Sequence, residues 1–116
     1  MNFLILLASA NHFDNWDMVA DDERERYFRD YRAFADGVRE RGRILVGDAL
    51  HRPETGRTIQ SGADRTVTEG PYAETVEQLG GFYVIDVDDL ETAMAVARLL
   101  PREYTVEVRP TLGIEI

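Results

Sequence analysis

Hydrophobic and polar residues follow different periods along this chain, and each change of period marks a predicted element. Residues 3–8 are apolar at every position, which is typical of a strand buried on both faces. Residues 21–41 place apolar side chains at helical spacing behind three acidic residues, where the helix dipole favours negative charge. Gly42 supplies the stop signal of that helix. The polar stretch between these elements, residues 9–20, predicts a loop.

The middle of the chain predicts two more strands and a hairpin. Residues 44–50 begin with an apolar run and predict a strand. Two short runs of strand-forming residues, 57–60 and 65–68, flank a turn of small and polar residues and predict a β-hairpin. One short helical turn is expected after Gly70-Pro71, since Thr75 and the glutamine three residues later form a capping-box pattern.

The last third of the chain predicts a second strand–helix–strand unit. Residues 81–87 form a strong apolar strand. Asp88 or Asp89 is expected to cap a helix that Pro101 ends. Residues 104–109 alternate apolar and polar side chains with a period of two, which is typical of a half-buried strand.

This order of elements predicts the fold class. Strand–helix–strand, hairpin, strand–helix–strand is the ferredoxin-like split βαβ pattern of an α+β fold with an inserted β-hairpin, in one domain spanning residues 1–116. Two helices cover only one face of such a sheet, yet residues 3–8 and 82–85 are apolar on both faces. A second copy is the simplest cover. We therefore expect a homodimer in which two sheets pack face to face as a dimeric α+β barrel.

Composition narrows the function classes. The net charge of −9 argues against nucleic acid as a partner, because phosphate binding needs a positive footprint. The chain has no cysteine and no lysine, which excludes disulfides, thiolate nucleophiles and Schiff-base chemistry. No apolar run reaches the roughly 18 residues of a membrane span. Residues 3–8 are too short for a signal peptide and no basic residue precedes them, so we expect a cytoplasmic protein.

A turn-rich segment carries the most specific motif. Residues 69–77 read Glu-Gly-Pro-Tyr-Ala-Glu-Thr-Val-Glu, and a Gly-Gly strand follows. This motif resembles the signature Asp-Gly-Pro-Phe-Ala-Glu-Thr-Lys-Glu of the YCII-related proteins of the DGPF type, with Glu, Tyr and Val in place of Asp, Phe and Lys. The resemblance extends over essentially the whole chain and also implies the dimeric barrel. Relatives with this barrel include monooxygenases and dehydrochlorinases.

Three residues are candidates for acid–base catalysis. His12 follows the first strand, and a histidine there would serve as a general base or remain a solvated loop residue. His51 ends the second strand, where it would serve the same role or would be a polar residue on the surface of an edge strand. Glu69 sits before the Gly-Pro turn, where its carboxylate would lie at a pocket mouth as a base or would cap backbone N–H groups.

Five further residues are candidates for binding a ligand. Asp48 and Glu74 would add polar groups to the pocket, and Trp16 and Tyr72 would add aromatic walls. Arg109 alternates with the apolar face of the last strand and is expected to point into the barrel. There it would form an ion pair between subunits, with Glu107, or would anchor an anion.

The resemblance also removes one mechanism. The related YciI branch is thought to use a His–Asp dyad, and by our reading Tyr31 and Leu100 occupy those two positions. Two distant histidines have no metal-ligand spacing, and no cofactor motif is present, so we expect neither a metal nor a cofactor. The sequence favours a small-molecule-binding protein, and within that a cofactor-independent acid–base enzyme of isomerase, lyase or oxygenase type. The alternative is a non-catalytic ligand sensor or an accessory protein of an extracytoplasmic-function sigma factor.

Overall fold

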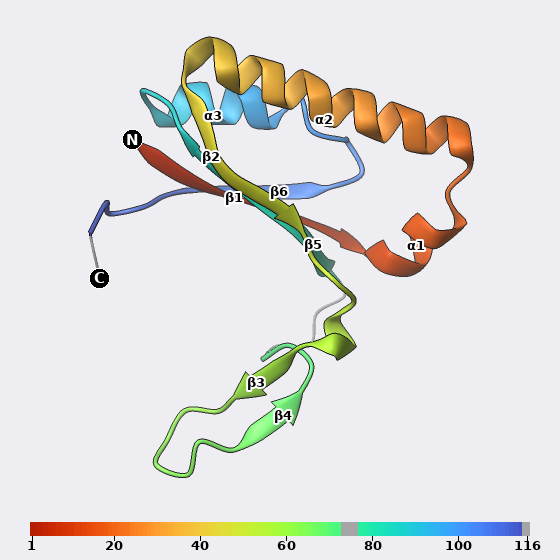
Figure 1. Cartoon of the computed structure of the whole chain (residues 1–116), viewed down its shortest axis with the longest axis vertical. Helices are drawn as coiled ribbons and strands as arrows, with labels where there is room; N and C mark the ends of the chain where they lie inside the picture. The colour runs from red at the N-terminus through yellow and green to blue at the C-terminus, as the bar shows by residue number, and fades with distance from the viewer. Residues whose placement is uncertain (73–76, 115–116) are drawn as a thin grey trace.

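The computed structural model describes residues 1–72 and 77–114. These form a four-stranded sheet, two longer helices on one of its faces and a separate two-stranded hairpin (Figure 1). The elements in chain order are β1 Asn2–Ala10, α1 His12–Met18, α2 Asp21–Arg41, β2 Arg43–Ala49, the 3-10 turn η1 Pro53–Thr55, β3 Arg57–Ile59, β4 Val67–Glu69, β5 Glu77–Asp86, α3 Leu90–Ala97 and β6 Thr105–Pro110.

The sheet has the strand order β2-β5-β1-β6, and all its neighbouring strands are antiparallel. This order interleaves the two strand–helix–strand halves of the chain, so β1 and β5 lie at the centre. The predicted α+β fold with an antiparallel sheet and an inserted hairpin is therefore confirmed.

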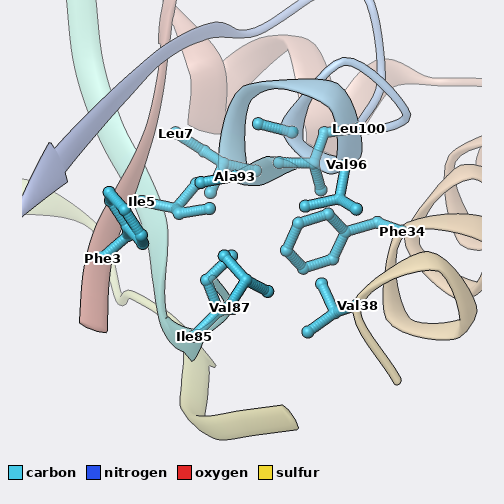
Figure 2. Packing of buried hydrophobic residues seen from close by; sticks show 11 residues of the cluster. Phe3, Ile5, Leu7, Phe34, Val38, Ile85, Val87, Ala93, Val96 and Leu100 are labelled. Atoms are coloured by element: carbon cyan, nitrogen blue, oxygen red, sulfur yellow. The ribbon is translucent and has the colours of Figure 1, made fainter. Parts of the chain in front are cut away.

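Helices α2 and α3 lie side by side over one face of the sheet and bury the core against it (Figures 1 and 2). Alternate residues of β1 point toward these helices, while Ile85 of β5 packs between the two layers. Figure 2 shows the cluster, which comprises Phe3, Ile5, Leu7, Phe34, Val38, Ile85, Val87, Ala93, Val96, Ala97 and Leu100. The shortest extent of the molecule is 18 Å, so there is room for only these two layers.

The opposite face of the sheet is also apolar, but none of the described helices covers it. Leu4 and Leu6 of β1 pair with Val84 and Phe82 of β5, and all four side chains are only partly buried. Val46 of β2, next to Val84, is 47% exposed. The sequence-based expectation of two apolar faces therefore holds for the central strands.

Residues 9–20 do not form the predicted loop. Strand β1 continues to Ala10, and α1 follows directly after Asn11, whose φ of 50° is in the left-handed region that asparagine tolerates. Gln78 lies in β5 rather than in a helical turn, and residues 73–76 are outside the described part of the chain. Helix α3 ends at Ala97, before Pro101, because i→i+3 bonds already tighten the chain there.

The hairpin β3–β4 extends away from the sheet, and most of its side chains are exposed (Figure 1). Substitutions in the hairpin should therefore affect stability much less than substitutions in the core.

We predict that Ile85→Ala lowers the free energy of unfolding by about 2–5 kcal/mol, since it opens a cavity in the core. Ile59→Ala in the hairpin is the matched control, because Ile59 is 57% exposed, and it should change stability by about 0.5 kcal/mol or less. Urea denaturation of both variants measures the difference; equal losses would contradict this division between core and hairpin.

Candidate functional site

A cavity of about 480 Å³ lies between α1, α2 and the ends of β2 and β5. Its volume is in the range of small-molecule sites. Most of its wall is aromatic, with a few polar groups between the rings. The lining residues are Leu7, His12, Phe13, Trp16, Phe28, Tyr31, Gly47, Asp48, Ala49, Leu50, Gly80, Gly81, Phe82, Tyr83 and Tyr104. This mixture is typical of a pocket that holds an apolar ring and orients it with few hydrogen bonds.

Helix α1 forms one wall of the cavity and is held by polar contacts. The Asn15 side chain donates to the carbonyl of Ala10, and the backbone N–H of Phe13 donates to Gln78 Oε1 of β5. Arg52, in the loop after β2, forms ion pairs with Asp14 at 3.0 Å and with Asp17. No residue of α1 is fully buried, so these contacts, rather than core packing, position the helix.

His12 is half-buried against the backbone of β5, where a β-bulge makes room for it. Leu7 pairs with Gly81 and the next residue, Ala8, pairs with Leu79, so Gly80 is the extra residue of the bulge. A Cβ added to Gly80 would lie 2.6 Å from His12 Nε2. The other ring nitrogen, Nδ1, is 3.4 Å from the hydroxyl of Ser9. The imidazole is thus fixed between a hydroxyl and a residue without a side chain.

Burial also sets the charge of this imidazole. Loss of solvent lowers the pKa of His12 below its usual value of 6.5, because the protonated form is the more costly to desolvate. The ring lines a second, more polar cavity of about 360 Å³, to which Glu77 and Glu103 contribute. His12 is therefore a neutral base at pH 7 that contacts an aromatic cavity and a polar one.

Two tyrosine hydroxyls meet in the aromatic cavity. The hydroxyl of Tyr31, on α2, donates to the hydroxyl of Tyr104, just before β6, over 2.7 Å. Desolvation raises the pKa of both tyrosines, and the hydrogen bond to Tyr104 raises the pKa of Tyr31 further. The rings of Tyr104 and His12 have centroids 5.4 Å apart. A neutral base and neutral hydroxyl groups thus line the same small space.

The structure brings together three of the residues singled out from the sequence. His12, Trp16 and Asp48 all line the aromatic cavity. Trp16 packs near Tyr27 and Phe28 of α2. The side chain of Asp48 is exposed, and its Oδ1 accepts a hydrogen bond from the N–H of Ala49.

The other predicted site residues lie elsewhere in the protomer. Glu69 is at the end of the hairpin strand β4, exposed and 3.9 Å from Arg57. His51 is exposed in the loop after β2, and Tyr72 is 88% exposed. Arg109 pairs with Glu107 two residues before it on β6, so this ion pair forms within one strand. None of these four lines the aromatic cavity, and Glu74 is outside the described residues.

Several residues of the cavity were not predicted as site residues. The sequence pattern does not mark Phe13 or Tyr104 as site residues, and Tyr31 stands out only as the replacement of a catalytic histidine. The spacing of Phe13 and Trp16, three apart in a polar stretch, is the one local signal that places two rings on the same side of a helix. Among the described residues, no group of three histidine, aspartate or glutamate side chains is placed to hold a metal ion. No helix in that same part of the chain is both long and apolar enough to cross a membrane.

Comparison with known proteins identifies the family. The model of the YCII-related domain matches residues 1–110 of the chain. The uncharacterized protein R00369 of Rhizobium meliloti (strain 1021) is 37% identical over an alignment of 94 residues, and the alignment covers 77% of this chain and 76% of that protein. The family match covers β1, the helices, the hairpin and the strands that form the cavity. The chain therefore belongs to the YCII-related domain family.

Proposed function

We propose that the aromatic cavity binds a small, largely apolar aromatic molecule and that His12 acts there as a general base without a cofactor. The observation that carries this proposal is a neutral, half-buried imidazole that lines a cavity walled by aromatic rings. A general base works best when it is unprotonated at the working pH and can reach its proton donor directly. An isomerase, a lyase or a cofactor-independent oxygenase would all use such a base.

One observation favours the alternative of a non-catalytic ligand sensor or accessory protein. Catalytic histidines are usually oriented by a carboxylate, whereas the neighbour of His12 Nδ1 is the hydroxyl of Ser9. Both functions need the cavity to bind a ligand, so binding is tested first and the dependence on His12 second.

The open face of the sheet supports a second part of the proposal, that two protomers pack these faces together as a dimeric barrel. Leu4, Leu6, Phe82 and Val84 form a continuous apolar strip on the two central strands, with Val46 beside it. Apolar area of this kind on a soluble protein usually marks an interface. A second copy would cover the strip with an identical one, as a two-fold interface requires.

Binding can be followed with the protein's own fluorescence, since Trp16 lines the cavity and is the single tryptophan of the chain. Nitrobenzene, an aromatic quencher, should quench Trp16 fluorescence in a saturable manner. Gly80→Ala should weaken this binding about tenfold, because the added Cβ displaces the His12 ring. Gly56→Ala is the control, since its Cβ would meet the carbonyl of Pro53 at an ordinary 3.4 Å. Quenching that stays linear with concentration in the wild type would contradict the binding site.

Protonation of His12 should also destabilise the folded protein. Its pKa is lower in the folded state than the unfolded value of 6.5, so the unfolded state binds more protons below that pH. The free energy of unfolding should therefore fall between about pH 7.5 and about pH 5.5, and His12→Gln should show a smaller fall. His51→Gln, at an exposed position, should behave like the wild type. Chemical denaturation at the two pH values measures these slopes, and parallel slopes for His12→Gln and the wild type would refute the assignment.

The dimer is tested by placing a charge on the open face. Leu6→Asp should produce monomers at micromolar concentration, because an unpaired carboxylate would be buried between the two sheets. Ile59→Asp, on the exposed hairpin, should leave the dimer intact. Sedimentation velocity distinguishes the two states. A wild-type protein that sediments as a monomer at these concentrations would exclude the barrel.

A further inference from the structure

The tyrosine pair in the aromatic cavity has a chemical property that a single buried tyrosine lacks. Tyr31 uses its hydroxyl proton in the bond to Tyr104, so the Tyr104 oxygen is the acceptor of the pair. Among the described residues, Tyr31 is the one hydrogen-bond partner of the Tyr104 hydroxyl. The proton of Tyr104 therefore remains available to a ligand. The hydrogen bond that Tyr104 accepts from Tyr31 polarises its hydroxyl group, so a hydrogen bond that Tyr104 donates to a ligand is strengthened.

We infer that Tyr104 donates a hydrogen bond to an oxygen of the ligand, that Tyr31 positions and polarises it, and that the substrate is a small aromatic compound with an enolisable carbonyl group. This inference rests on the proposed function, because it names the substrate class of the same cavity. Two features of the geometry support it. The ring centroids of Tyr104 and His12 are 5.4 Å apart, and both residues line the same cavity, so one small ligand can contact both. The rest of the wall, including Phe13, Phe28 and Trp16, offers apolar surface to the ring that carries that group.

The chemistry that these groups support is proton abstraction next to a carbonyl. His12 removes a proton from the carbon beside the carbonyl: the C–H bond breaks and an N–H bond forms on the imidazole. The electron pair moves into a new C=C bond as the carbonyl oxygen gains negative charge, and the Tyr104 hydroxyl stabilises that oxygen by hydrogen bonding. Return of the proton from His12 to the same or to another carbon completes exchange or isomerisation. These proton transfers balance without an oxidant, a reductant or a metal.

The charge of the protein favours neutral carbonyl compounds over anionic substrates. The chain carries a net charge of −9, and Arg52, beside Phe13, is already paired with two aspartates. A neutral ketone enters such a cavity without the cost of desolvating an anion. Negative charge then appears only during the reaction, on the oxygen next to Tyr104. Donors that gain strength as charge develops are those that accelerate a reaction.

The test compares two probes that differ by one oxygen. The anion of 4-nitrophenol represents the enolate, and nitrobenzene is the same nitro-substituted ring without the phenolic oxygen. Binding of both probes is titrated by Trp16 fluorescence. The absorbance of bound 4-nitrophenol reports its ionisation. Tyr104→Phe should weaken binding of the phenolate about tenfold and that of nitrobenzene less than about twofold. Tyr31→Phe should give a smaller loss in the same direction, and a lower phenolate fraction at a fixed pH.

Phe28→Leu is the matched control, since Phe28 lines the cavity without a hydroxyl, and it should affect both probes equally. A phenolate affinity that is unchanged in Tyr104→Phe, or equal losses for both probes, would overturn the role of the tyrosine pair and leave the cavity as a binding site. Absence of binding of both probes to the wild type would overturn the proposed function as well.

The proton transfer itself is measured by exchange of the methyl hydrogens of acetophenone with deuterium from D₂O, followed by proton NMR. The wild-type protein should accelerate exchange over buffer, and His12→Gln and Tyr104→Phe should each reduce the acceleration at least about tenfold. Exchange that is no faster than in buffer would overturn the inference, even if the aromatic probes bind.

Discussion

The two central strands of the sheet are apolar on both faces, but in the described part of the chain α2 and α3 cover only one face. This constraint determines most of the architecture. On the covered face, α2 and α3 bury Phe3, Ile5 and Ile85 in a core that fills the 18 Å thickness of the molecule. On the other face, Leu6 and Phe82 lie next to each other and are only partly buried. A single protomer thus leaves apolar surface exposed to water, which a second sheet would remove.

The cavity lies at the edge of the covered face, where the helices no longer pack on the hydrophobic core. Beyond the core, α2 continues past the sheet, and α1 turns back toward β5 instead of adding to the hydrophobic layer. Aromatic side chains project into the space between them. Two glycines keep that space open, because a Cβ on Gly47 would collide with the ring of Tyr83 and one on Gly80 with that of His12. The bulge at Gly80 belongs to the central pair of strands, so the site is attached to the centre of the sheet.

The sequence predicted those features that depend on local burial. The helix at residues 21–41 with its stop at Gly42 and the alternating last strand appear where the pattern placed them, because periodicity reports which side of an element is buried. The hairpin is exposed, and it was predicted from the turn residues between its two strands. The candidate site was predicted less well. His12 was predicted because it follows a strand end and Trp16 because it is aromatic, but Tyr31 and Tyr104 are 73 residues apart and are joined only by the fold. Glu69 illustrates the converse: the Gly-Pro motif defines a turn, but it does not determine the direction in which the hairpin extends.

The electrostatic character of the site differs from that of the protein surface. Acidic residues dominate the chain, and its arginines are largely used in ion pairs on the surface, such as those of Arg26 and Arg52. The cavity instead contains a neutral imidazole and protonated tyrosines, since burial lowers the pKa of His12 and raises that of Tyr104. A site without a fixed positive charge cannot hold a substrate by its anionic group, so specificity must come from ring shape and from one or two hydrogen bonds. Such a site stabilises negative charge only where a donor is already oriented toward it, and the Tyr31–Tyr104 pair is the donor that we propose beside His12.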